Sequence, residues 1–217
     1  MSIKENLLSI KDNLPEDVTL VAVSKTKPVT DLMEAYNAGQ RIFGENKIQE
    51  MAEKHEEMPK DIQWHMIGHV QRNKVKYMAE FVNLIHGVDS YKLLKEIDKQ
   101  AKKYDRTIDC LLQIKIAEED SKFGMSAEDA YTLLESDEFS ELEHINIVGL
   151  MGMATFTDNT TQVENEFNFL KTTFDKLRTL NSELKTISMG MSGDYELAIE
   201  CGSTMIRVGS SIFGARN

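Results

Sequence analysis

A regular alternation of short apolar stretches with amphipathic helical stretches constrains the fold of this chain most strongly. Strand-like stretches recur along the 217 residues at 19–23, 41–46, 62–68, 84–88, 109–116, 145–151, 186–191 and 204–208. Between them, apolar residues at helical spacing predict helices over 29–38, 47–57, 72–80, 90–103, 126–134, 161–180 and 195–201, and one more helix precedes the first strand at 2–13. Such strand–helix units build either a closed barrel or an open doubly wound sheet.

The turn after the first strand distinguishes these two folds. A doubly wound sheet usually carries a glycine-rich phosphate turn at this place. Here the turn is SKTKP (24–28), which contains no glycine. No linker or low-complexity tract interrupts the alternation. The sequence therefore predicts a single (β/α)8 TIM barrel with an extra N-terminal helix, in which residues 1–217 form one domain.

Composition excludes several function classes. The net charge of −11 argues against nucleic acid as a partner, because phosphate binding needs a basic surface. No apolar run approaches the length of a membrane span, and the N-terminus shows no signal peptide. The two cysteines, Cys110 and Cys201, make no disulfide framework and indicate a reducing compartment. We therefore expect a cytoplasmic protein without nucleic-acid or membrane partners.

The first apolar stretch, 19–23, is predicted to continue as a strand that ends in a lysine, Lys25, whose position has two interpretations. Because side chains alternate along a strand, Val21, Val23 and Lys25 share one face. Lys25 either extends from the strand end to solvent, or is a desolvated amine of lowered pKa, suited to forming a Schiff base.

In a barrel, the functional site lies at the carboxyl ends of the strands. Polar candidates follow these ends at Lys25, Glu45, Asn46, His69, Thr155, Ser192, Arg207, Gly209 and Ser210. Strands give way to solvated loops there, so Glu45, His69 and Thr155 carry little weight individually.

Two segments at the last two strands predict a phosphate site. Ser192 opens a helix after the seventh strand, and Gly209 with Ser210 repeats the arrangement after the eighth. Either alone is typical of an ordinary helix cap; together they favour a phosphate monoester. Arg207 shares a strand face with Gly209, and a buried guanidinium there needs an acceptor. Considered apart from Lys25, Arg207 would be interpreted as one half of a structural ion pair with a carboxylate.

No metal site or catalytic residue is predicted. His65 and His69 have the spacing of helical zinc ligands, but in an extended segment they lie on the order of 13 Å apart. Tyr195, Met151 and Met153 are interpreted as packing residues.

Several motifs resemble a known family. AVSKTKP (22–28), FGENKIQE (43–50), WHMIGHVQRNK (64–74), SKFGM (121–125) and SMGMSGDYELAIECGSTMIRVGSSIFGAR (188–216) resemble, in order, the pyridoxal-phosphate homeostasis proteins, which are related to the N-terminal barrel of bacterial alanine racemase. Segments 53–61 and 155–160 match nothing in that family.

The resemblance implies a site for pyridoxal 5′-phosphate (PLP). It implies an internal aldimine on Lys25, phosphate contacts from Ser192, Gly209 and Ser210, Arg207 facing the pyridine nitrogen, and Asn46 beside the cofactor. An arginine at that nitrogen makes the ring a weak electron sink, and no tyrosine can be assigned as the second acid/base of a racemase.

We therefore expect a protein that stores, buffers or delivers PLP, with transient apo-enzyme clients. The lack of the racemase's additional β domain favours a monomer. The competing hypotheses are a single-domain PLP-dependent amino-acid racemase, and a cofactor-free barrel acting on a phosphorylated sugar or amine.

Overall fold

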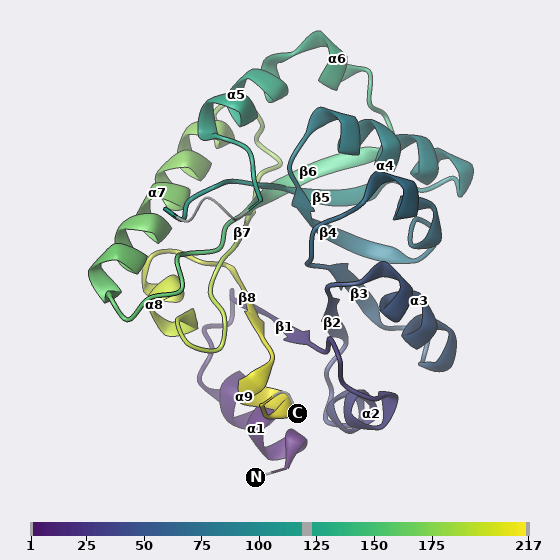
Figure 1. Ribbon diagram of the computed structural model, residues 1–217, viewed down its shortest axis with the longest axis vertical. Coiled ribbons are helices and arrows are strands. Elements are labelled where there is room, and N and C mark those ends of the chain that lie inside the picture. The colour runs from purple at the N-terminus through teal and green to yellow at the C-terminus, as the bar shows by residue number, and fades with distance from the viewer. Residues whose placement is uncertain (1, 119–122, 216–217) are drawn as a thin grey trace.

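The computed structural model describes residues 2–118 and 123–215, and its centre is a closed barrel of parallel strands in the order β1 to β8. The strands are β1 (Thr19–Val23), β2 (Ile42–Glu45), β3 (Gln63–Met66), β4 (Val82–Val88), β5 (Ile108–Gln113), β6 (Ile145–Met151), β7 (Thr186–Ser188) and β8 (Met205–Val208). Each strand pairs with its sequence neighbour, and β1 closes the barrel against β8. The predicted (β/α)8 barrel is confirmed (Figure 1).

Helices surround this barrel and connect its strands. They are α1 (Ile3–Asp12), α2 (Val29–Asn37), α3 (Ile48–Glu57), the 3₁₀-helix η1 (Arg72–Tyr77), α4 (Tyr91–Lys103), α5 (Ala127–Glu135), α6 (Asp137–Ser140), α7 (Thr160–Arg178), α8 (Tyr195–Glu200) and α9 (Ser210–Phe213). The predicted helix before the first strand is α1, which begins in a capping box between Ser2 and Glu5. None of the helices in the described ranges is long and apolar enough to cross a membrane.

The alternation of side chains along each strand divides the apolar core into two parts. Inside the barrel lies a small cluster formed by Val21, Leu84, Leu111, Met151 and Met205. Outside it, a much larger layer packs between strands and helices and includes Leu20 and Ala22 of β1. The predicted division of β1 into an inward and an outward face is therefore confirmed, since Val21 and its two neighbours face opposite sides.

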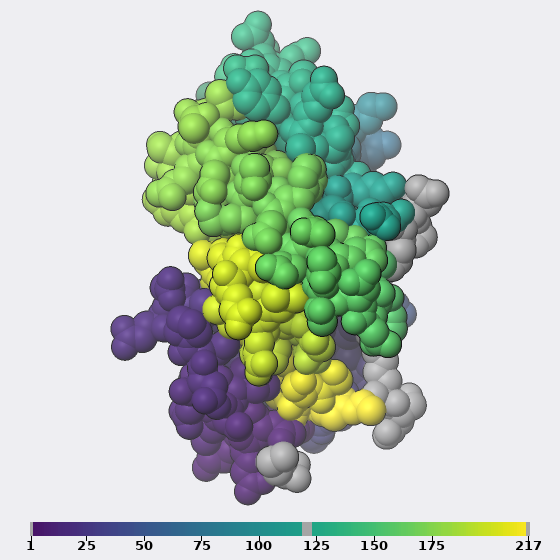
Figure 2. Space-filling model, turned by 90° about the vertical axis from the view of Figure 1, so that its left-hand side faces the viewer, coloured from purple at the N-terminus to yellow at the C-terminus, as the bar shows by residue number. Residues whose placement is uncertain are grey.

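Closure of the barrel brings the two ends of the chain together. In the register between β1 and β8, Val21 lies opposite Arg207. On the outer surface, the Asn6 side-chain amide of α1 donates to the carbonyl oxygen of Ile212 in α9 at 3.1 Å. Figures 1 and 2 show the purple amino-terminal segment beside the yellow carboxyl-terminal segment. The site residues that follow β1 and β8 thus become neighbours although they are far apart in sequence.

Several predicted strands end a few residues earlier in the structure, and three differences bear on the architecture. The helix expected over 72–80 is the shorter 3₁₀-helix η1; its buried residue Val75 and the buried Met78 directly after its end are three apart, which suits three residues per turn. The seventh strand ends at Ser188, yet hydrogen bonds from Met189 N–H to Met205 O and from Arg207 N–H to Gly190 O continue the pairing irregularly.

The third difference is the presence of α6 and α9, which the periodicity did not predict because each spans only one turn. Tertiary packing accounts for α9, which lies against α1. Of the motifs singled out in the sequence, Ser121, Lys122 and Arg216 lie outside the described residues.

Candidate functional site

A cavity of about 1020 Å³ opens at the carboxyl ends of the strands. Its volume lies at the upper end of the range for small-molecule sites. All six predicted site residues line it: Lys25, Asn46, Ser192, Arg207, Gly209 and Ser210. The barrel thus brings together residues from the ends of β1, β2, β7 and β8.

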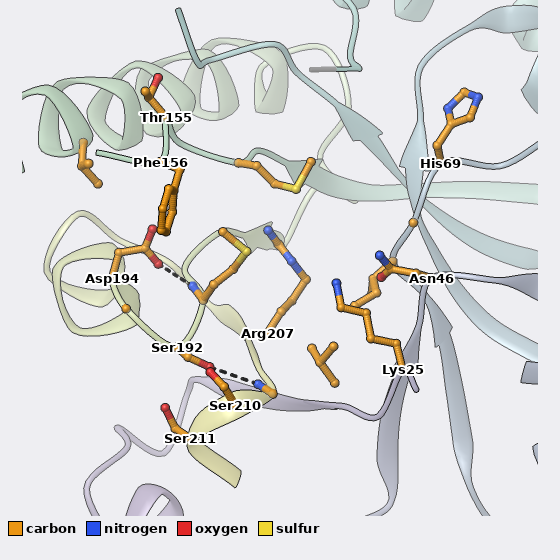
Figure 3. A pocket seen from close by; sticks show the side chains of 18 of the residues that line it. Lys25, Asn46, His69, Thr155, Phe156, Ser192, Asp194, Arg207, Ser210 and Ser211 are labelled. Atoms are coloured by element: carbon orange, nitrogen blue, oxygen red, sulfur yellow. Dashed lines mark hydrogen bonds between the residues drawn. The ribbon is translucent and has the colours of Figure 1, made fainter. Parts of the chain in front are cut away.

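Lys25 lies in a turn just past the end of β1. The strand ends at Val23, two residues earlier than the interpretation of a strand ending in lysine required. Val23 and Lys25 nevertheless both line the cavity, so the predicted shared face is confirmed. In Figure 3, Lys25 projects into the cavity beside Arg207, and Ser192 and Ser210 lie on the other side of Arg207.

Glu45, one of the polar candidates at the strand ends, faces away from the cavity. It is fully buried and accepts hydrogen bonds from Lys54 Nζ of α3 at 2.8 Å and from Ser24 Oγ at 2.6 Å. Burial raises the pKa of this carboxyl group, and the nearby Lys54 ammonium partly opposes the rise. The next residue, Asn46, has the opposite orientation and lines the cavity.

The two predicted phosphate segments contact each other directly. Ser192 Oγ accepts a hydrogen bond from Gly209 N–H at 3.2 Å, so this N–H is already used within the protein. A Cβ at Gly209 would lie 3.1 Å from the carbonyl oxygen of Val23, a tight contact, so the small size of glycine suits the close packing against β1. The phosphate contact predicted for Gly209 stays a prediction. Ser210, at the start of α9, faces the cavity.

Arg207 is a buried cation with neutral acceptors. Its Nη1 donates to Ser188 Oγ at 2.6 Å, and its Nη2 donates to the carbonyl oxygen of Gly152 at 3.1 Å. These contacts replace the carboxylate partner that the structural interpretation required. Burial lowers the pKa of Arg207 to about 10, and the negative charge of Asp194 partly opposes this. The guanidinium therefore stays charged at neutral pH and can donate into the cavity that it lines.

Two buried histidines continue this hydrogen-bonded chain into the barrel. His86 Nδ1 lies 3.0 Å from Ser188 Oγ, and His86 Nε2 lies 3.1 Å from His65 Nδ1. The guanidinium of Arg207 can only donate, so Ser188 Oγ accepts from it. We therefore infer that the Ser188 hydroxyl donates to His86 Nδ1, and that the protonated Nε2 of His86 donates to His65 Nδ1. Burial lowers the pKa of His65 to about 3 and that of His86 well below its usual value, so both rings are neutral.

The sequence did not predict this series of hydrogen bonds, although it gave one indication of it. His65 and His86 occupy inward positions of neighbouring strands, but partners across the barrel cannot be read from spacing. His69 has separate surroundings: its ring stacks on Phe123 at 4.0 Å, and its Nδ1 lies 3.4 Å from Asp89 Oδ2. The two histidines of the HMIGH segment thus belong to different environments.

The loop over 155–160, which matched nothing in the sequence analysis, forms one wall of the cavity. Thr155, Phe156 and Asp158 line it, and Phe156 is 95% exposed. Thr155 is held by Glu166 of α7, which accepts from the backbone N–H of Thr155 at 2.6 Å and from its hydroxyl at 2.7 Å.

Comparisons with known proteins agree with this geometry. The sequence model of the family described as alanine racemase, N-terminal domain, matches residues 1–217. The pyridoxal phosphate homeostasis protein of Pasteurella multocida is 38% identical over 232 residues, covering 100% of this chain and 99% of that protein.

Solved structures show the same similarity. PipY of Synechococcus elongatus, solved without PLP, superposes with a TM-score of 0.93 at 36% identity, covering 98% of this chain and 100% of that one. PipY solved with PLP bound gives a TM-score of 0.89 at the same 36% identity, covering 98% of this chain and 100% of that one. Alanine racemase of Clostridium difficile shares the fold at 16% identity, with a TM-score of 0.79 over 99% of this chain and 60% of that one. The chain therefore belongs to the alanine racemase N-terminal domain family and, within it, to the pyridoxal phosphate homeostasis proteins.

Proposed function

We propose that residues 1–217 form a single domain that binds PLP and stores, buffers or delivers it, with little or no racemase turnover. One observation carries the proposal: Lys25, the buried cation Arg207 and the two predicted phosphate segments, at Ser192 and at Ser210, line one cavity. The similarity to proteins of PLP homeostasis, and to PipY solved with PLP bound, supports it.

The side chains fit the chemical groups of this cofactor. When bound, PLP supplies an aldehyde, which condenses with a primary amine and releases water. Lys25 offers the amine, and Asn46 stands beside it. Ser192 and Ser210 offer hydroxyl groups for the phosphate. Ser188 and Gly152 each accept one N–H of the Arg207 guanidinium and hold it in place. Its other N–H groups make Arg207 the donor for the ring nitrogen.

The same residues favour holding the cofactor over turnover. Arg207 keeps its proton at neutral pH, so it donates a hydrogen bond to the ring nitrogen without protonating it. Racemisation also needs an acid/base group on each face of the substrate carbon. Among the described residues that line this cavity, none is a tyrosine.

We also propose that the protein works in the cytoplasm as a monomer and transfers PLP to apo-enzyme clients. Two features support a reducing compartment: Cys110 and Cys201 are both free, and burial raises the pKa of the Cys110 thiol, which keeps it protonated. The net charge of −11 argues against nucleic acid as a competing partner. Light scattering of the purified protein tests the monomer, and a stable dimer would contradict it.

The experiment that tests the function is the visible spectrum of purified protein after addition of PLP. We expect an absorbance band of a lysine-linked cofactor in the wild type and its loss in Lys25→Ala. The exposed Lys47, in the same region of the chain, is the matched control, and Lys47→Ala should keep the band. A wild type without the band, or a band that survives in Lys25→Ala, contradicts the assigned attachment point.

Two further assays separate carrier from enzyme. The loaded protein should restore activity to an apo-enzyme that depends on PLP, with the transferred PLP accounting for the loss of the band. Incubation with L-amino acids should yield no more D-amino acid than free PLP does. Faster racemisation than free PLP would favour the single-domain racemase instead.

A further inference from the structure

A buried ion cluster lies directly behind the turn that carries Lys25. Lys54 Nζ of α3 donates three hydrogen bonds of 2.8 Å, to the carbonyl oxygen of Ser24, to Glu45 Oε1 and to Glu50 Oε1. The Lys54 side chain is only 7% exposed, so its ammonium faces the protein and not the solvent. The cluster is thus built by one helix and the end of one strand, outside the barrel wall.

Each residue that flanks Lys25 is held by this cluster. On one side, the Ser24 carbonyl oxygen accepts from Lys54, and Ser24 Oγ donates to Glu45 Oε1 at 2.6 Å. On the other side, Thr26 N–H donates to Glu50 Oε1 at 2.5 Å. Both ends of the lysine's own backbone are therefore tied, through two carboxylates, to a single ammonium.

The turn itself has a conformation that needs this support. Lys27 N–H donates to the Ser24 carbonyl oxygen at 3.1 Å, which closes a turn over 24–27. Its third residue, Thr26, has a φ of 65°, in the left-handed region where such turns ordinarily place glycine. A β-branched residue is strained there and persists only where its surroundings determine the conformation. Glu50 supplies that determination by accepting the Thr26 N–H.

We propose that Lys54, Glu45 and Glu50 are positioning residues that fix the backbone on both sides of Lys25 and so aim its amine at the cofactor's aldehyde. The proposal rests on the proposed function and adds to it. A buried ion pair is weak support for stability, because apolar replacements are often as stable. The contacts of this cluster with the Lys25 turn therefore call for a role in the site.

The role can be separated from a general loss of structure by comparing two ligands. PLP carries the aldehyde that reacts with Lys25, whereas pyridoxine 5′-phosphate has the same ring and phosphate without the aldehyde. A wrongly oriented Lys25 amine should weaken the binding of PLP and leave the binding of pyridoxine 5′-phosphate unchanged. Two variants serve. The first is Glu50→Ala, since the Glu50 side chain is 22% exposed in the wild type. The second is Lys54→Met with Glu45→Gln, which removes the fully buried carboxylate together with its ammonium.

We expect both variants to bind PLP at least about tenfold more weakly than the wild type, since small misplacements of a reacting group are costly. Their affinity for pyridoxine 5′-phosphate should stay within about twofold of the wild type, a change too small to reflect a lost contact. Lys171→Met is the control, because Lys171 forms an exposed pair with Asp175 four residues along α7. It should match the wild type for both ligands.

A rescue experiment tests the strained turn. Glycine adopts positive φ without penalty, so Thr26→Gly should recover part of the PLP affinity lost in Glu50→Ala. Equal weakening of both ligands would show a merely structural role and overturn the proposal, as would variants that bind PLP like the wild type. A wild type with no lysine-linked band would instead overturn the proposed function itself.

Discussion

The buried pair His65 and His86 predicts that the folded protein loses stability steeply as the pH falls from 7 to 5. Both rings are neutral in the fold, where burial lowers the pKa of His65 to about 3 and that of His86 well below its usual value. In the unfolded chain both titrate near their ordinary pKa of about 6.5. Below that pH the unfolded state therefore binds protons that the native state does not.

The magnitude follows from this difference in bound protons. The stability contributed by each neutral histidine is complete above the unfolded pKa and is lost as the pH falls toward the folded pKa. Each pH unit costs at most about 1.4 kcal/mol for each proton bound, so each histidine costs about 2 kcal/mol between pH 7 and pH 5. The pair together costs about 4 kcal/mol, a large part of the roughly 5–15 kcal/mol that stabilises a typical domain.

Glu45 acts in the opposite direction, because burial raises its pKa above the usual value. The native state then takes up a proton before the unfolded state does, which offsets part of the loss. A variant isolates the histidines from this effect. His86→Gln removes one titrating ring and keeps an amide that can hydrogen-bond to Ser188 and His65, so its loss between pH 7 and pH 5 should be about 2 kcal/mol smaller than that of the wild type.

Urea unfolding followed by circular dichroism at both pH values measures this difference. His144→Gln is the control, because His144 precedes β6 outside the barrel interior and takes no part in the buried pair. If wild type and His86→Gln lose the same free energy of unfolding between pH 7 and pH 5, the reasoning about a neutral buried pair is wrong.

Three further predictions concern other parts of the fold. Gly149→Ala should destabilise the protein by about 3 kcal/mol in urea unfolding, because a Cβ there would collide with the carbonyl oxygen of Thr186 on β7; an unchanged unfolding midpoint would contradict the close approach of β6 and β7. Arg207→Met should weaken PLP binding at least about tenfold in equilibrium dialysis, since it removes a charged donor and the hydrogen bond that Ser188 Oγ accepts from it. An affinity equal to that of the wild type would exclude contact between Arg207 and the ring. Ser126→Ala should cost about 1 kcal/mol of stability through loss of the α5 cap, with PLP binding unchanged, and a calorimetric Tm equal to that of the wild type would refute the cap.

The amino-acid sequence was sufficient to predict the barrel and the end of it that carries the site. Alternating strand and helix periodicity depends on short-range geometry, so it could be read locally. The same alternation correctly placed Val23 and Lys25 on one face, and the strand ends correctly indicated that Ser192, Arg207 and Ser210 line one cavity. These features need only the fold class and the direction of each strand.

Contacts between distant segments could not be predicted in this way. The pattern did not show that Glu45 turns outward to Lys54, or that Gly209 already gives its N–H to Ser192. It also left the partners of Arg207 open, where a carboxylate was one expectation and Ser188 is the finding. Each of these pairings depends on the register and closure of the barrel, which bring side chains from different strands within hydrogen-bond distance.

For this protein, local chain geometry thus determined which residues reach the cavity, and the tertiary structure decided what holds each of them there. The physical reason is that side-chain direction repeats every two residues along a strand, whereas a buried polar group takes whichever partner the closed barrel brings near it.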